Sequence, residues 1–302
     1  MDLPSASTAT PRRVEHLQTD KGYVPVYTTA IVEQPWSSYT RTEHQTWAQL
    51  FDRQTRLLPG RACREFLDGL ARFGMGAHAI PRFDALNLAL KKATGWTLIG
   101  VEGLLPELDF FQHLEAREFP VTWWIRKPEQ IDYISEPDLF HDLFGHVPLL
   151  INPVFADYMQ AYGAGGVKAA RNSPDALQFL TRLYWYTVEF GLIRSTEGLR
   201  IYGAGILSSK SESIYSLEDA APNRIGFDLL RLMRTRYRID TYQKTYFVID
   251  DFAQLFEATE PDFTPYYAQL RPLEAIPAGS VLASDRVLQR GSGDGWLADG
   301  DI

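Results

Sequence analysis

Apolar residues at helical spacing recur through the first third of the chain, and this pattern constrains the fold more than any other feature. The spacing predicts helices over residues 42–57, 62–73 and 81–93. Runs typical of β-strands are few and short, at residues 96–101, 121–125 and 246–249. We therefore predict a mainly α fold with a few short β-strands.

The chain of 302 residues reads as one large folded unit with loose ends. Residues 1–37 are rich in Pro, Ser and Thr without a clear period, which predicts a partly disordered N-terminal arm. No long linker interrupts residues 38–277, so we expect one folded domain there. Residues 278–302 are rich in Gly, Ser and Asp, which predicts a loosely ordered tail.

Composition excludes several classes of protein. The net charge of −8 leaves no general basic surface for nucleic acid. A single cysteine, Cys63, excludes an internal disulfide framework and any multi-cysteine metal site. No signal peptide and no run of about 18 apolar residues is visible, so no membrane partner is expected. We expect a cytoplasmic protein.

Two histidines lie close together in the stretch SEPDLFHDLFGHVPLL, residues 135–150. Ser135 is the expected N-cap of a helix there and Gly145 its expected end. His141 and His146 are five residues apart, and on an unbroken α-helix that step turns the side-chain direction by about 140°. A break at Gly145 would let the two imidazoles converge.

Glu189 is the candidate third ligand for a metal at these histidines. It lies among apolar residues in LTRLYWYTVEFGLIRS, where an ionised carboxylate is costly unless it is paired or binds a cation. The alternative is a structural ion pair with Arg182 or Arg194, and the histidines alone are compatible with an ordinary core. Trp185, four residues before Glu189, would place an aromatic wall beside a ligand.

Two imidazoles and one carboxylate leave open positions on Fe(II), the arrangement of non-heme iron oxygenases that use dioxygen. A zinc-dependent hydrolase or a metal-stabilised binding protein is the competing interpretation. Helical zinc hydrolase motifs space their histidines four apart, whereas the spacing here is five. This difference favours the iron interpretation.

Several motifs resemble those of the pterin-dependent aromatic amino acid hydroxylases, most closely the bacterial members that act on phenylalanine. They are SEPDLFHDLFGHVPLL, RLYWYTVEFGL, YGAGILSS, GLLPELDFF and WWIRKPEQIDYISEPD, and they span about residues 95–250 in order. The resemblance implies a helix-rich, basket-like single catalytic domain. It also implies Fe(II) bound by His141, His146 and Glu189.

The resemblance further implies a tetrahydrobiopterin or related reduced pterin beside the iron. The matching cofactor positions are Gly103, Leu105, Phe110, Asp142 and Tyr184. Asp142 departs from the family, which usually has Glu there. Without the motif context, Phe110 would be taken as an ordinary core residue.

The implied reaction converts L-phenylalanine to L-tyrosine with O2 and the reduced pterin. The matching substrate positions are Arg126 for the carboxylate, Asp138 as its partner, Pro137, Trp185, Phe190 and Gly205 around the ring, and Ser208 beside the first imidazole. Without the motifs, Arg126 would be taken as a surface charge.

Val248 matches a position that is apolar in phenylalanine hydroxylases and acidic in tyrosine hydroxylases. It therefore predicts a preference for phenylalanine, because it offers no partner to a phenol hydroxyl. The chain shows neither the N-terminal regulatory domain nor the heptad-patterned C-terminal helix of animal relatives, so we expect a monomer.

Overall fold

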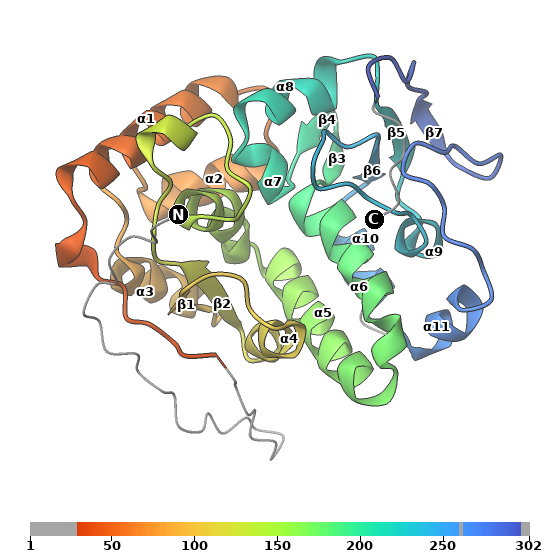
Figure 1. Cartoon of the computed structure of the whole chain (residues 1–302), viewed down its shortest axis with the longest axis horizontal. Helices are drawn as coiled ribbons and strands as arrows, with labels where there is room; N and C mark the ends of the chain where they lie inside the picture. Colours follow the sequence, from red (N-terminus) through yellow and green to blue (C-terminus); the bar gives the residue numbers. More distant parts are fainter. Residues whose placement is uncertain (1–28, 260–261, 297–302) are drawn as a thin grey trace.

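The computed structural model describes residues 29–259 and 262–296 and folds them mainly into helices (Figure 1). The longest helix, α5, and its successor α6 cross the middle of the molecule, with a small sheet on one side and a larger sheet on the other. The helices in chain order are α1 (Arg41–Leu57), α2 (Arg64–Phe73), α3 (Phe83–Ala93), α4 (Glu107–Glu115), α5 (Pro153–Asn172), α6 (Leu177–Tyr184), α7 (Ala204–Leu207), α8 (Lys210–Glu218), α9 (Leu229–Met233), α10 (Phe252–Thr259) and α11 (Thr264–Leu270). Within the described ranges, none has both the length and the apolarity that a membrane span requires.

The strands form two separate sheets. The smaller pairs β1 (Thr97–Val101) with β2 (Glu118–Thr122) in parallel. The larger has the order β4-β3-β6-β5-β7, and its members are β3 (Leu192–Ser195), β4 (Gly198–Ile201), β5 (Asn223–Gly226), β6 (Thr245–Ile249) and β7 (Val287–Gln289). Because β6 is central and its five residues are all buried, it forms the core of this sheet.

The three helices expected in the first third of the chain are confirmed as α1, α2 and α3. Helix α1 begins with a capping box, in which Thr40 Oγ1 accepts from the amide of Glu43 and the Glu43 carboxylate accepts from the amide of Thr40. Helix α2 ends at Gly74, whose φ of 60° lies in the left-handed region that favours glycine. Local sequence signals therefore set these boundaries.

The strand expected at residues 121–125 is displaced, because β2 spans Glu118–Thr122. Its partner β1 ends at Val101, which pairs with Thr122, so no ladder remains for the residues that follow. The strands expected at residues 96–101 and 246–249 correspond to β1 and β6, whereas the other strands of the larger sheet were not expected.

Both ends of the described chain pack against the domain. The amide of Val32 donates to the carbonyl of Gly100, so the segment from residue 29 joins β1, and residues 1–28 of the expected arm lie outside the described residues. The expectation of a loose tail is wrong for residues 278–296. There β7 pairs with β5, and Asp285 forms a buried ion pair with Arg231 at 2.9 Å between its Oδ1 and the arginine Nε.

A buried carboxylate on α8 gives the first testable prediction. Glu212 Oε1 accepts from the Tyr246 hydroxyl at 2.6 Å and from the Gln243 amide at 3.3 Å, and burial raises the pKa of Glu212 from 4.5 to about 7. An acid with a raised pKa in the folded state stabilises that state least at high pH. The wild type should therefore lose stability relative to Glu212→Gln as pH rises from about 4.5 to about 7, by on the order of 2–3 kcal/mol.

Urea unfolding of both proteins at several pH values between 4.5 and 8 measures this difference directly. The contributions of other titrating groups cancel in the difference between the two unfolding free energies, because both proteins contain those groups. Stability curves that run parallel across this range would show that the Glu212 carboxyl has an ordinary pKa.

Candidate functional site

His141 and His146 are the two ends of one π-helical segment, His141–His146. The helical stretch begins at Leu139, and Asp138 caps it, because its Oδ1 accepts from the amide of His141 at 3.1 Å. The expectation that Ser135 is the cap is wrong. Ser135 lies in an exposed bend before the helix starts.

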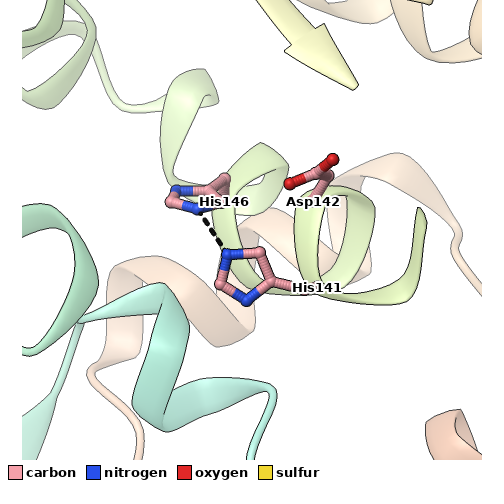
Figure 2. Close-up of side chains that lie close together, drawn as sticks. All are labelled: His141, Asp142 and His146. Carbon is pink, nitrogen blue, oxygen red and sulfur yellow. Dashed lines mark hydrogen bonds between the residues drawn. The ribbon is translucent and has the colours of Figure 1, made fainter. Parts of the chain in front are cut away.

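The two imidazoles converge, with 3.0 Å between the Nε2 atoms of His141 and His146 (Figure 2). A π-helix links residues five apart through its hydrogen bonds, so a spacing of five brings side chains onto one face. No break at Gly145 is needed, and the expectation that the helix ends there is wrong. The chain instead continues into a 3₁₀ helix at Val147–Ile151.

Gly145 has a packing role. A Cβ at this position would lie 2.9 Å from the carbonyl oxygen of Ala204 in α7. The absence of a side chain therefore lets α7 approach the histidine segment closely. This approach brings Ser208, which follows α7, to His141.

Glu189 faces both histidines from a second π-helical segment, Trp185–Glu189. Its Oε1 lies 3.1 Å from His146 Nε2 and its Oε2 lies 3.5 Å from His141 Nε2. The alternative of an ion pair with arginine is wrong, because Arg182 donates to the carbonyl of Met233 and Arg194 pairs with Asp250. Both segments that converge here are therefore π-helical, a form often found at functional sites.

Asp142 is a second carboxylate near the histidines (Figure 2). One of its oxygens lies within 4.8 Å of both imidazoles. Its Oδ2 accepts from the amide of Thr122 at 2.7 Å, and burial raises its pKa to about 7. Glu189, in contrast, places one oxygen within ion-pair distance of each Nε2 atom, at 3.1 and 3.5 Å.

His141 is in the neutral form that a metal ligand requires. Burial lowers the pKa of His141 to about 4, so the imidazole is neutral at pH 7. The Ser208 hydroxyl donates to the carbonyl of Ala204 at 2.9 Å, and Ser208 Oγ lies 3.0 Å from His141 Nδ1. Because a hydroxyl has one hydrogen, Oγ accepts from Nδ1–H, which leaves the lone pair of Nε2 directed at the other two groups.

Glu189 is held in its charged form. Burial acts to raise its pKa, but the interactions with His146 and His141 and the hydrogen bond from the backbone of Gly205 outweigh burial, so the pKa is lowered. The Glu189 carboxylate and the Nε2 atoms of the two imidazoles thus converge on one point. This donor set fits a divalent cation.

A row of aromatic rings leads from the histidines to the expected pterin residues. The Tyr184 ring lies 6.3 Å from His146 and 5.4 Å from Phe110, between ring centres. Phe110 is in the first turn of α4, and Gly103 and Leu105 are half-buried in the loop between β1 and α4. The structure therefore links Phe110 to His146 through the ring of Tyr184.

Arg126 is buried and forms a two-pronged ion pair with Asp138. Its Nε lies 2.9 Å from Oδ2 and its Nη2 lies 2.8 Å from Oδ1. Burial acts to raise the pKa of Asp138, but Arg126 outweighs it and the pKa is lowered. Within the described residues, Nη1 of Arg126 has no hydrogen-bond partner. The interpretation of Arg126 as a surface charge is wrong, and one edge of its guanidinium remains available for a second carboxylate.

Three of the expected ring-binding residues lie together. The rings of Trp185 and Phe190 are 4.7 Å apart between centres, and a Cβ at Gly205 would lie 2.9 Å from Cζ of Phe190. Pro137 is half-buried directly before Asp138. Val248 is fully buried in β6 between Leu192 and Gly226, so its role in substrate selection stays a prediction.

Comparison with known proteins identifies the family. Residues 27–269 match the family described as biopterin-dependent aromatic amino acid hydroxylase. The chain belongs to this family. This hydroxylase is 63% identical to the phenylalanine-4-hydroxylase of Ralstonia nicotianae, over 90% of this chain and 86% of the relative. It is 61% identical to the phenylalanine-4-hydroxylase of Chromobacterium violaceum, over 89% of this chain and 90% of the relative.

Solved structures of the Chromobacterium violaceum enzyme resemble this hydroxylase over most of its length. One structure with bound iron(III) and 7,8-dihydrobiopterin has a TM-score of 0.82 and 60% identity, covering 85% of this chain and 92% of that one. Another, with iron(III), has a TM-score of 0.83 and 62% identity, covering 85% of this chain and 93% of that one. The family and its relatives thus establish a hydroxylase that works with iron and a pterin.

Two residues beside the site of this hydroxylase were not predicted from the sequence. Tyr237 stacks on Trp185 with ring centres 4.4 Å apart, and Gln243 accepts from the Trp185 indole N–H at 3.0 Å. They lie about 50 or more residues after Trp185, without a local spacing that would connect them to it. Only the fold brings this loop to the indole.

Proposed function

We propose that this chain is a phenylalanine 4-monooxygenase, which converts L-phenylalanine to L-tyrosine with O2 and a tetrahydropterin at a non-heme Fe(II) centre. The observation that carries the proposal is the convergence of His141, His146 and Glu189, whose Nε2 and carboxylate oxygen atoms lie within 3.5 Å of one another. This set of ligands leaves open positions on iron for oxygen chemistry. Iron and the reduced pterin, when bound, supply the activation of O2.

His141, His146 and Glu189 hold the iron in this proposal. Ser208 fixes the tautomer of His141, and Asp138 caps the segment that carries both histidines. These contacts position the ligands before metal binds, so the chain does not have to reorganise around the ion.

Phe110 provides an aromatic face for the pterin, and Tyr184 lies between that face and His146. Gly103 and Leu105 border the same space from the loop after β1. The carboxyl of Asp142 is the proposed polar partner of the pterin or of a water beside it. Its hydrogen bond from Thr122 keeps one oxygen fixed on the backbone of β2.

The amino acid substrate binds through both of its ends. The free edge of Arg126 takes the substrate carboxylate, while Asp138 holds the guanidinium in place from the other edge. Trp185, Phe190, Gly205 and Pro137 surround the ring. Their apolar surface excludes water and holds the ring beside the metal ligands.

The remaining proposals concern the whole molecule. One chain supplies every residue assigned above, which supports a monomer that needs no partner subunit, nucleic acid or membrane. The packing of α7 against both π-helical segments of the site, and of α6 against Trp185–Glu189, supports the description of the domain as a basket. A cytoplasmic location is consistent with the buried free thiol of Cys63.

Tyrosine formation is the decisive experiment. Metal-free protein is loaded with Fe(II) or Zn(II) and given L-phenylalanine, O2 and a tetrahydropterin, and each component is omitted in turn. We expect tyrosine only when Fe(II), pterin, phenylalanine and O2 are all present. Turnover without pterin, or with zinc in place of iron, would contradict the proposed function and favour hydrolytic or other metal chemistry.

A further inference from the structure

The indole of Trp185 is held by three side chains that lie outside its π-helical segment, those of Tyr237, Phe190 and Gln243. Tyr237 stacks on it at 4.4 Å with an interplanar angle of 20°, and Phe190 lies at 4.7 Å and 37°. The indole N–H donates to Oε1 of Gln243 at 3.0 Å. The rings restrict the plane of the indole, and only the hydrogen bond distinguishes one edge of it from the other.

Gln243 is itself fixed on several sides. It is buried, with 3% of its surface exposed. Its Nε2 donates to the carbonyl of Arg238 at 3.0 Å, and its backbone amide donates to Oε1 of Glu212 at 3.3 Å. The amide side chain therefore connects the indole to the loop between residues 238 and 243, and the backbone connects that loop to α8.

The anchor of this network is rigid. The same oxygen of Glu212 accepts from the hydroxyl of Tyr246 at 2.6 Å, and Tyr246 is a fully buried residue of β6, the central strand of the larger sheet. The path from Trp185 to the sheet thus passes through three hydrogen bonds, and Gln243, Glu212 and Tyr246 along it are all buried. Buried hydrogen bonds are stronger than exposed ones.

We propose that Gln243 is a positioning residue for the ring of the substrate, acting through Trp185 without touching the substrate. This inference rests on the proposed function, in which Trp185 borders the ring. The torsion that rotates an indole about its Cβ–Cγ bond is broad and roughly two-fold, so this torsion alone does not fix the orientation of the ring. The hydrogen bond to Gln243 selects the orientation that presents a fixed edge to the ring of the substrate.

Gln243→Leu tests the proposal, because it keeps the approximate volume and removes both side-chain hydrogen bonds. We expect the KM for L-phenylalanine to rise roughly fivefold to tenfold while the KM for the pterin changes less than about twofold. The fraction of oxidised pterin that yields tyrosine should fall as well, since a misplaced ring reacts less often. Gln243→Glu, which retains an acceptor for the indole, should lie between the wild type and Gln243→Leu.

A matched control separates positioning from stability. Gln160 accepts from Arg117 Nε at 2.9 Å and donates to the carbonyl of Glu115 at 3.0 Å, so Gln160→Leu also removes one acceptor and one donor bond. We expect it to lower the melting temperature without separating the two KM values. Equal changes in both KM values for Gln243→Leu would overturn the proposal.

A double-mutant cycle shows whether Gln243 acts through Trp185. If it does, Gln243→Leu should add little to the phenylalanine KM of Trp185→Phe, which already lacks the indole donor. Additive effects would show that Gln243 acts by another route and would overturn the proposal.

A spectroscopic measurement on metal-free protein does not depend on activity. The ¹H–¹⁵N signal of the Trp185 indole, assigned by its loss in Trp185→Phe, should shift in Gln243→Leu and stay in place in Gln160→Leu. An unchanged signal would overturn the positioning role. If wild-type protein forms no tyrosine, the proposed function fails, whereas a shifted indole signal would still establish the Gln243–Trp185 contact.

Discussion

Glu189→Ala should lose iron binding and tyrosine formation together while the protein remains folded. The variant removes the one carboxylate whose two oxygens lie 3.1 and 3.5 Å from the Nε2 atoms of His146 and His141. Mutation of a residue that only hydrogen-bonds to a metal ligand typically lowers metal affinity about 10- to 100-fold. Loss of a ligand itself should therefore lower the affinity by more than roughly 100-fold. Metal-free variant and wild type should melt within about 5 °C of each other, because the change also removes a buried acid.

Asp142→Asn is the matched control, since it neutralises the other carboxylate near the histidines and keeps an acceptor for the Thr122 amide. We expect it to bind one iron per chain and to raise the KM for the pterin. Iron content by elemental analysis after reconstitution and dialysis distinguishes the two variants. If Glu189→Ala kept its iron and Asp142→Asn lost it, Asp142 would be the ligand in place of Glu189.

The residues of the candidate metal site could be nominated from sequence, but their convergence could not be derived from it. Two histidines in one apolar segment and a carboxylate among apolar residues were sufficient to nominate His141, His146 and Glu189, with an ion pair to Arg182 or Arg194 as the alternative for the carboxylate. Their convergence depends on two π-helical segments, which form because the backbone hydrogen bonds shift by one residue. No local residue pattern predicts this change from α-helical to π-helical hydrogen bonding. From the sequence we therefore expected the helix to break at Gly145.

The secondary structure shows a similar contrast between elements that local sequence patterns predict and elements that depend on distant pairing. The first three helices were predictable because caps and apolar spacing are local. Strand β3 has only four residues, and it pairs with β6, more than 50 residues later. Strand β7 lies in a segment whose Gly, Ser and Asp content suggests a loose tail, and its pairing with β5 stabilises it there. Pairing between distant segments is therefore what the sequence left open.

The same limit applies to the candidate substrate-binding residues and their neighbours. Arg126 and Asp138 are near in sequence, and their pairing in the structure agrees with the expected arrangement. Tyr237 and Gln243 reach Trp185 only through the fold. Residues that position a side chain from a distant loop carry no spacing signal, which is why the structure was needed to find them.

Arg126→Lys should raise the KM for L-phenylalanine by roughly 10- to 100-fold and leave the KM for the pterin within about threefold. The guanidinium uses Nε and Nη2 on Asp138 and can present its other edge to the substrate carboxylate at the same time. An ammonium group is a single point of charge and lacks this fork, so the buried Asp138 would compete with the substrate for it. Initial rates with each substrate varied in turn measure both constants.

Arg231→Lys provides the control, because Arg231 and Asp285 form another buried ion pair, with side chains 6% and 3% exposed. Both variants should lose stability, since each leaves a buried aspartate with a poorer partner. Only Arg126→Lys should separate the two KM values. If Arg231→Lys raised the phenylalanine KM as much, or if Arg126→Lys raised both constants equally, the Arg126–Asp138 pair would be a structural feature of the domain and the carboxylate of the substrate would bind elsewhere.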